Sequence, residues 1–593
     1  MLDRTGVRTV AGPVTGRGRL SVMTTRPTPA PAAPDSARSA PARSAPALPA
    51  PGGPAPRTLL LRGGHVYSPA DPLATALLVQ DGQVAWVGSQ SAAESYARDA
   101  DQVVDLAGAL VTPAFVDAHV HATAAGLALT GLDLTGCPSL AEALARIAGF
   151  VRARSAAAGG SGGVVLGHGW DETGWPERRA PSLAELDAAC AGAAVYLSRT
   201  DVHSALASSP LRALAARTHD LAALPGHHPE QPLTRDAHHA VRAAALAHQT
   251  PAQRDLAQRA ALRRAAELGI AAVHECAGPG ISSAEDLTAL LELAGQGPGP
   301  EVFGYWGELG AVDTARRLGA VGAGGDLFVD GAIGSHTACL HAPYTDSGGD
   351  GAEYLTADQI ADHVGACTGA GMQAGFHAIG DAALGDVLRG FRAAADRLGL
   401  ARVRALRHRV EHAELLDEDG IAAFAELGLT ASVQPAFDAA WGGAEGMYRT
   451  RLGAERALAM NPFAALLRAG VPLAFGSDAP VTALDPWGTV RAAAFHRTPG
   501  HRVSVRAAFT AHTRGGWRAL GRDDTGTLTP GAPASYAVWA PTELLVQAPD
   551  QRVANWSTDP RAGVPGLPDL TPGRPLPRCL ATVVRGRTAY LAE

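Results

Sequence analysis

The segment Val116 to His121 reads VDAHVH and ends the apolar run ALVTPAFV that begins at residue 109. On a β-strand, residues i and i+2 point to the same face. His119 and His121 therefore project side by side from the end of one strand, where two imidazoles can bind one divalent metal. A His-x-His pair alone is weak evidence, because many such pairs are solvated. The apolar residues before it favour a buried strand over an exposed loop.

From residue 251 onward, helical stretches that end in glycine alternate with short apolar strands that end in a polar residue. Glycine is the usual stop signal at a helix C-terminus, and alternating helices and strands indicate a parallel sheet of βα units. The predicted strands are FVDAHVH, IAAVHE, EVFGYWG, DLFVDGA, MQAGFHA, RVEHAE, LTASVQP and PLAFGSD. Eight such units predict an α/β fold, a (β/α)8 TIM-like barrel with its active site at the C-terminal strand ends.

The rest of the chain divides around this barrel. Residues 1–57 are rich in Pro, Ala and Ser and predict a disordered tail. Residues 58–112 contain two strand-like runs joined by Asp81-Gly82, a strong hairpin signal. We expect them to form the N-terminal part of a small β-sandwich domain, which residues 499–593 complete. The barrel then spans residues 113–498, with an insertion at about 122–250 after its first strand.

Composition excludes several classes of protein. The formal charge of −7 offers no basic footprint for nucleic acid. No apolar run reaches membrane-spanning length, so no membrane partner is expected. The six cysteines form no Cys-x-x-Cys pair, which argues against a thiolate zinc site and a disulfide framework and favours the cytoplasm. A small-molecule substrate is the expected partner, and a homodimer is expected by analogy only.

Three further polar residues end predicted strands: His377 in GFHAIGD, His412 in RVEHAE and Asp478 in AFGSDAP. With His119 and His121 they would converge on one barrel mouth. Imidazole and carboxylate ligands suit zinc, and a catalytic zinc site keeps one position open for water. The sequence therefore predicts a divalent metal centre, with zinc as the expected ion.

The chain resembles the amidohydrolase superfamily, and within it the YtcJ-like amidohydrolase-3 group. The segments that carry the resemblance run in order over roughly residues 60–590 and include TPAFVDAHVH, GHGWDETGW, LSRTDVHSAL, LFVDGAIGSHTACLHAPYTD, GFHAIGDAALGDVL, HRVEHAELLDEDG and AFGSDAPVTALDP. The resemblance implies a metal-dependent hydrolase barrel with a flanking β-sandwich. It places His119, His121, His377, His412 and Asp478 at metal and catalytic positions, with Asp478 as proton acceptor and His412 as the second catalytic candidate.

The chain departs from many relatives at strand four, where they carry a carbamylated lysine that bridges two metals. The sequence has no lysine, since all 50 basic residues are arginine, and Asp326 takes the equivalent place. An Asp side chain is shorter than a carbamylated lysine, so we expect one firmly bound ion and a weak second one. Asp330 lies four residues on and is a reserve ligand, or else it only holds the following Gly-rich loop.

Weaker signals suggest where a substrate would bind. The stretch GHGWDETGW offers Trp170 and Asp171 as pocket walls, although buried packing of the indoles is an equal alternative. His203 follows a predicted strand of the insertion, and His274 ends the second barrel strand. His336 lies in a loop where relatives show arginine, and a structural role is favoured there.

Three functions remain open. The first is hydrolysis of a non-peptide carbon–nitrogen bond, as in an amide, an N-substituted formamide or a cyclic amide. The second is deamination of a heterocycle, although the family's deaminases carry a glutamate soon after the strand-five histidine, and this chain has Asp381 there. The third is a catalytically silent, metal-binding regulatory protein, which the complete set of four histidines and Asp478 disfavours.

Overall fold

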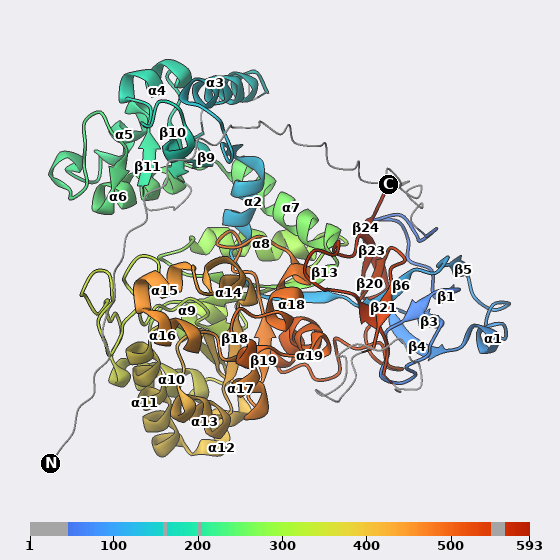
Figure 1. Cartoon of the computed structure of the whole chain (residues 1–593). Helices are drawn as coiled ribbons and strands as arrows, with labels where there is room; N and C mark the ends of the chain where they lie inside the picture. Colours follow the sequence, from blue (N-terminus) through green and yellow to red (C-terminus); the bar gives the residue numbers. More distant parts are fainter. Residues whose placement is uncertain (1–45, 158–162, 200–203, 547–563) are drawn as a thin grey trace, which may run out of the picture. The chain divides into compact units, whose positions relative to one another are not determined.

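The computed structural model describes residues 46–157, 163–199, 204–546 and 564–593. Eight parallel strands form its central sheet, with helices packed around it (Figure 1). In chain order these are β7 (Phe115–Val120), β13 (Ile270–Ala277), β14 (Glu301–Trp306), β15 (Gly322–Ala323), β16 (Gln373–Ala378), β17 (Arg409–His412), β18 (Thr430–Val433) and β19 (Leu473–Phe475). A parallel bridge from Val120 to Ala479 joins β7 to the segment after β19. The sheet therefore closes on itself, and the predicted barrel is confirmed.

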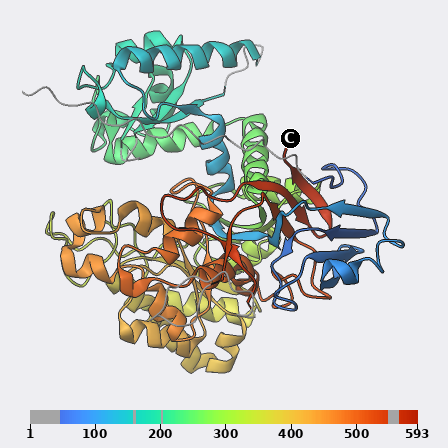
Figure 2. The same ribbon diagram turned by 45° about the vertical axis from the view of Figure 1, so that its right-hand side comes forward.

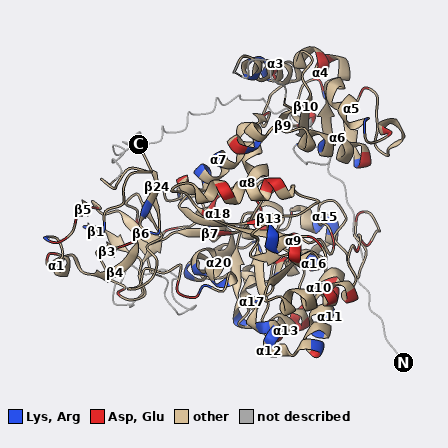
Figure 3. Cartoon of the chain, turned by 180° about the vertical axis from the view of Figure 1, so that it is seen from behind, with Lys and Arg blue, Asp and Glu red and all other residues tan. Residues whose placement is uncertain are grey.

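Helices between the strands supply the outer layer. They are α7 (Pro251–Glu267), α8 (Ala284–Gly295), α9 (Val312–Arg317), α10 (Ala357–Gly369), α11 (Asp381–Leu398), α12 (Leu400–Ala405), α13 (Glu418–Leu427), α14 (Pro435–Trp441), α15 (Met447–Leu452), α16 (Ala454–Ala459), α17 (Phe463–Arg468), α18 (Pro486–Ala494), α19 (Val505–Thr510) and α20 (Gly516–Ala519). Their apolar sides and the outward residues of the strands share one large core. Charged residues of both signs are interspersed on the helices, whereas the strands are mainly uncharged (Figure 3). None of the described helices is long and apolar enough to cross a membrane.

The fourth strand differs from the prediction. β15 is only Gly322–Ala323, and the predicted strand DLFVDGA follows it as an irregular segment with one bridge, Phe328 to His377. Gly324 explains this position: its φ is +142°, and a Cβ there would lie 2.2 Å from the backbone nitrogen of Gly375. The backbones can approach so closely only without side chains. The glycine cluster therefore brings the chain inward just before Asp326.

The insertion folds on its own sheet. Its elements are α2 (Ala122–Thr130), β8 (Leu132–Asp133), α3 (Leu140–Ala157), β9 (Val165–Trp170), α4 (Leu183–Cys190), β10 (Val195–Arg199), β11 (Ser204–Ala207), α5 (Ser209–Ala215), β12 (Leu233–Thr234) and α6 (Arg235–Ala247). The sheet order is β12-β11-β10-β9-β8, and separate apolar clusters lie on its two sides. The insertion is thus an α/β unit with a core of its own.

Both chain ends build the β-sandwich, as predicted (Figure 2). One sheet contains β1 (Thr58–Arg62), β3 (Ala76–Gln80), β4 (Gln83–Gly88) and β5 (Gln102–Asp105); the other contains β2 (His65–Val66), β6 (Leu110–Pro113), β20 (Tyr536–Trp539), β23 (Cys579–Val584) and β24 (Arg587–Leu591). The short pair β21 (Leu544–Leu545) and β22 (Leu567–Pro568) and the helix α1 (Gln90–Ala93) accompany them. Asp81 and Gly82 have φ of 50° and 76° in the β3–β4 turn, which confirms the predicted hairpin.

The predicted tail needs one correction. Residues 46–57 are described, and Leu48 packs into the sandwich core with 6% of its surface exposed. An apolar side chain stays on the core because burial removes its surface from water. The predicted disorder of residues 1–45 lies outside the described residues. The other predicted domain boundaries stay predictions.

Candidate metal centre

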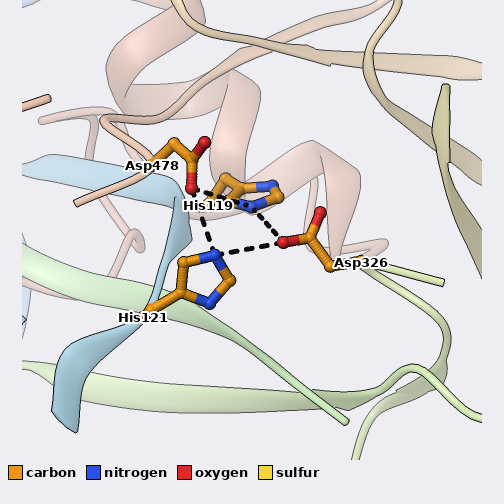
Figure 4. A group of neighbouring side chains, drawn as sticks. All are labelled: His119, His121, Asp326 and Asp478. Atoms are coloured by element: carbon orange, nitrogen blue, oxygen red, sulfur yellow. Dashed lines mark hydrogen bonds and ion pairs between the residues drawn. The ribbon is translucent and has the colours of Figure 1, made fainter. Parts of the chain in front are cut away.

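Strand β7 and the residue that follows it present His119 and His121 to one cluster at the barrel mouth (Figure 4). The Nε2 atom of His121 lies 3.0 Å from Oδ2 of Asp326 and 3.1 Å from Oδ1 of Asp478. The Nε2 atom of His119 lies 3.3 Å and 3.4 Å from the same two oxygens. These four residues form a compact group in which every ligand atom lies within 4.8 Å of the others.

A second group shares Asp326 with the first. Its other oxygen, Oδ1, lies 3.3 Å from Nδ1 of His377 and 3.5 Å from Nε2 of His412. The rings of these two histidines have centroids 4.4 Å apart. Asp326 thus stands between the histidine pair at the end of β7 and the pair on β16 and β17. The glycines before it bring its backbone inward, so its short side chain reaches both pairs.

The opposite nitrogen of each ring is held by a neighbour. Nδ1 of His119 donates to Oε2 of Glu411 (2.8 Å), and Nδ1 of His121 donates to the carbonyl of Cys276 (2.9 Å). Nδ1 of His412 lies 2.7 Å from Oε1 of Gln434, and Nε2 of His377 lies 3.3 Å from the carbonyl of Gly331. A ring nitrogen that faces a carbonyl or carboxylate must carry the hydrogen. The other nitrogen faces the cluster, where it can give up a proton and turn a lone pair towards a cation, as a metal ligand does.

The carboxylates of the cluster need a positive charge beside them, which protons or a metal can supply. Burial disfavours a charge on His121, yet hydrogen bonds with Asp326 and Asp478 raise its pKa well above the ordinary value. Burial likewise raises the pKa of Asp326, but the charge of His119 and hydrogen bonds with three histidines outweigh it and hold that pKa far below its usual range. Protonated histidines thus balance the carboxylates. A divalent metal can replace these protons, since neutral imidazoles and ionised carboxylates are its ligands.

Two buried ligand atoms support the fit of a metal. Among the described residues, Nε2 of His412 is buried without a hydrogen bond. Oδ1 of Asp478 faces only the rings of His119 and His121, which are themselves candidate ligands. His412 and Asp478 also have a left-handed backbone, with φ of 68° and 55°. Such conformations cost about 1–3 kcal/mol for a residue other than glycine and concentrate at functional sites. The fold therefore retains backbone strain at one residue of each of the two groups.

Asp330 is not part of the cluster, and the prediction of a reserve ligand is wrong. Its Oδ1 accepts the N–H of Ile379 (3.0 Å), and its Oδ2 accepts those of Gly380 (2.8 Å) and Cys339 (2.9 Å). The carboxylate holds the loop after strand four, which was the other interpretation of this residue.

Four of the five predicted substrate residues are described, and each contacts other residues of the chain. Trp170 is buried in the insertion core and donates to the carbonyl of Leu197, and Asp171 pairs with Arg199. His274 is fully buried inside the barrel with its Nδ1 3.0 Å from Nη1 of Arg409. His336 pairs with Asp346 at 2.9 Å. Burial corrects the predictions for Trp170 and His274, whose side chains are occupied by packing. Asp171 and His336 are partly exposed and stay predictions; His203 lies outside the described residues.

Sequence reasoning missed the residues that hold the histidines. Glu411 and Arg409 lie two apart on β17, both fully buried. Asp117 accepts the N–H of His119 (3.2 Å) and that of Ser477 (2.9 Å), and burial raises its pKa to about 6. The signal for Arg409 and Glu411 was present in the sequence. Two charged residues at positions i and i+2 of a barrel strand share one face. They therefore point into the barrel together or are exposed together.

The chain is an eight-stranded parallel barrel with four imidazoles and two carboxylates at the carboxyl ends of its strands. This arrangement is typical of metal-dependent hydrolases. The family comparison agrees with this class. The chain belongs to the amidohydrolase family, whose model matches residues 102–590.

Individual proteins show the same similarity. "Protein LONG AFTER FAR-RED 3" of Arabidopsis thaliana is 26% identical over 81% of this chain and 86% of its own length. The N-substituted formamide deformylase of Arthrobacter pascens is 25% identical over 78% of this chain and 90% of its own length. Among solved structures, an uncharacterized metal-dependent hydrolase from Pyrococcus furiosus is 27% identical, with a TM-score of 0.67 over 81% of this chain and 98% of its own.

Proposed function

We propose that this hydrolase cleaves a non-peptide carbon–nitrogen bond of a small molecule, of the amide, N-substituted formamide or cyclic amide type. The proposal rests on one observation. Ligand atoms from opposite sides of the closed barrel meet in one group, which consists of His119, His121, Asp326 and Asp478. The family supports the proposal, and so does the name of the Arthrobacter relative, a formamide deformylase. The cytoplasmic location and the homodimer stay predictions.

We assign one firmly bound ion, zinc, to His119, His121, Asp326 and Asp478. The second group, which consists of Asp326, His377 and His412, has one ligand fewer and would hold a second ion more weakly. A divalent metal supplies Lewis acidity, which polarises a carbonyl and lowers the pKa of water.

Asp478 is the proposed proton carrier. Its Oδ1 faces the histidine pair of β7, and its backbone is fixed by the N–H bond to the carbonyl of His119 (2.8 Å). From this position the carboxylate would accept the proton of the attacking water and return it to the leaving nitrogen, as a general base and then a general acid. His412 faces Asp326 from the opposite side, and Gln434 fixes its ring.

Deamination has less support in the structure. The residue at the family's glutamate position, Asp381, begins α11, and its Oδ1 accepts the backbone N–H groups of His341 (2.9 Å) and Ala382 (3.0 Å). A carboxylate engaged in this way is poorly placed to protonate a heterocycle.

One assay tests the proposal. The purified, metal-loaded protein is offered N-substituted formamides, N-acyl amines, cyclic amides and aminated heterocycles, and products are measured as amine, acid or ammonia. Release of an organic amine or opening of a cyclic amide supports the proposal. Ammonia release from heterocycles alone would replace it with deamination, and no turnover of any class by a protein that binds metal would favour the silent regulatory protein.

A further inference from the structure

We propose that Glu411 and Arg409 are positioning residues, which form a buried charged floor beneath the metal centre and fix the ring of His119. The inference rests on the proposed function only for the metal that His119 faces.

The two residues form a side-on ion pair within one strand. Nη2 of Arg409 donates to Oε2 of Glu411 at 2.8 Å, and Nε of Arg409 donates to Oε1. Both side chains are fully buried. Two parallel N–H···O bonds of this kind fix the orientation of both side chains and add to the attraction between their charges.

The same Glu411 oxygen that accepts from Arg409 also accepts from Nδ1 of His119, at 2.8 Å. This bond decides which ring nitrogen of His119 carries the hydrogen, and it leaves Nε2 facing Asp326 and Asp478. A carboxylate behind an imidazole ligand is a recurrent device that orients the ring and raises its basicity.

Arg409 connects this floor to most of the barrel. Its Nη2 donates to the carbonyl of Ala118 on β7 and to Oγ of Ser432 on β18 (2.8 Å). Its Nη1 donates to Nδ1 of His274 on β13 (3.0 Å), and its guanidinium lies 4.4 Å from the ring centroid of Tyr305 on β14. Burial and the charge of Arg409 hold the pKa of His274 well below its ordinary value, so this imidazole is a neutral acceptor. The guanidinium is therefore fixed from four strands besides its own.

Stability alone does not explain such a pair. Barrel interiors are ordinarily filled by branched apolar side chains, and replacing a buried ion pair by apolar residues is often neutral or stabilising. What apolar residues cannot supply is a fixed acceptor for Nδ1 of His119. We therefore assign the pair to the orientation of this ligand.

The test compares two variants of the full-length protein. Glu411→Gln changes one oxygen to an amide, and the double variant Arg409→Leu/Glu411→Leu removes both charges without leaving one unpaired. Metal affinity is measured by competition with a chromophoric chelator, and the cobalt-substituted proteins are compared by their visible absorption spectra. A matched control is Arg254→Leu/Asp286→Leu, which removes an ion pair between α7 and α8.

We expect both floor variants to fold, to bind metal about 10- to 100-fold more weakly, and to show a shifted cobalt spectrum. The control should keep the parental affinity and spectrum. Parental affinity and spectrum in Glu411→Gln would overturn the inference. Loss of folding in both floor variants would also overturn it, because the pair would then be structural. A parent protein that binds no metal would instead refute the proposed function.

Discussion

Asp478 and His119 meet twice across the seam that closes the barrel. The backbone N–H of Asp478 donates to the carbonyl of His119 at 2.8 Å, and the Oδ1 atom of Asp478 lies 3.4 Å from Nε2 of the same histidine. The first contact fixes the backbone of the last barrel strand to that of the first. The second brings the proposed proton carrier to the metal ligands, so the closure of the barrel also assembles the site.

The variant Asp478→Asn separates the two contacts. Asparagine tolerates the left-handed backbone at this position, where φ is 55°, better than most residues. We therefore expect normal folding, retained metal and a kcat at least about 100-fold lower, because the amide cannot accept a proton. Turnover and metal content by mass spectrometry check this result. A variant with undiminished turnover would remove Asp478 from proton transfer.

Metal content is the most direct prediction. After desalting, we expect about one zinc ion per chain, held by the group of four ligands, and a second ion only on titration. Removal of the metal by a chelator should lower the melting temperature, since a metal that binds only the folded state stabilises it. Two ions that both resist desalting would contradict the assignment of a weaker second group.

Much of this architecture could be predicted from the sequence, and the failures have physical causes. Glycine stops and apolar strands gave seven of the eight barrel strands at or near their observed positions, because both signals are local. The fourth strand was misplaced because the position of this segment depends on Gly324. That residue approaches the backbone of Gly375, which is distant in the sequence, so no local signal shows the contact.

The site shows the same division between local and distant signals. The five residues His119, His121, His377, His412 and Asp478 were named from strand-end positions, and the structure brings them together. Glu411 and Arg409 were missed because their role depends on partners up to about 290 residues away, such as Ala118 and His119. His274 is buried by packing against distant strands and contacts Arg409, which no local sequence pattern could reveal.

Asp326 and Asp330 provide a matched pair of variants. Asp326→Asn should lose most of its metal while the protein still folds, because the ionised carboxylate faces four imidazoles. Asp330→Asn should keep its metal but unfold more easily, by about 1–3 kcal/mol, since one of the two oxygens that accept backbone N–H groups becomes an NH2 group, which cannot accept. Metal content and urea unfolding of both variants distinguish the two roles. Metal loss in Asp330→Asn alone would reverse the assignment.

Phe328 is predicted to form a wall of the substrate site. Its neighbours Leu327 and Val329 are buried in the core, whereas Phe328 is 37% exposed. Its ring lies 4.7 Å from that of His377, centroid to centroid. Phe328→Ala should raise KM about 10-fold for substrates with a bulky apolar group on nitrogen and leave small ones unaffected.

The control for Phe328 is Leu467→Ala, which removes an exposed apolar side chain from the outer helix α17. It should change KM for neither class of substrate. Equal effects of Phe328→Ala on large and small substrates would argue for a structural role.

Acid should destabilise the protein through His512, which lies outside the metal centre. This side chain is fully buried against Phe115 and Phe475, and its Nδ1 donates to the carbonyl of Val116 (2.9 Å). Burial lowers its pKa to about 4. Between pH 4 and about 6.5 the unfolded chain binds more protons at this residue than the folded chain, so the free energy of unfolding falls as the pH falls. His512 should contribute about 2 kcal/mol to the loss from pH 7.5 to pH 5, measured by urea unfolding, and the loss should be smaller by that amount in His512→Phe. An unchanged pH slope in that variant would show that other groups dominate the acid response.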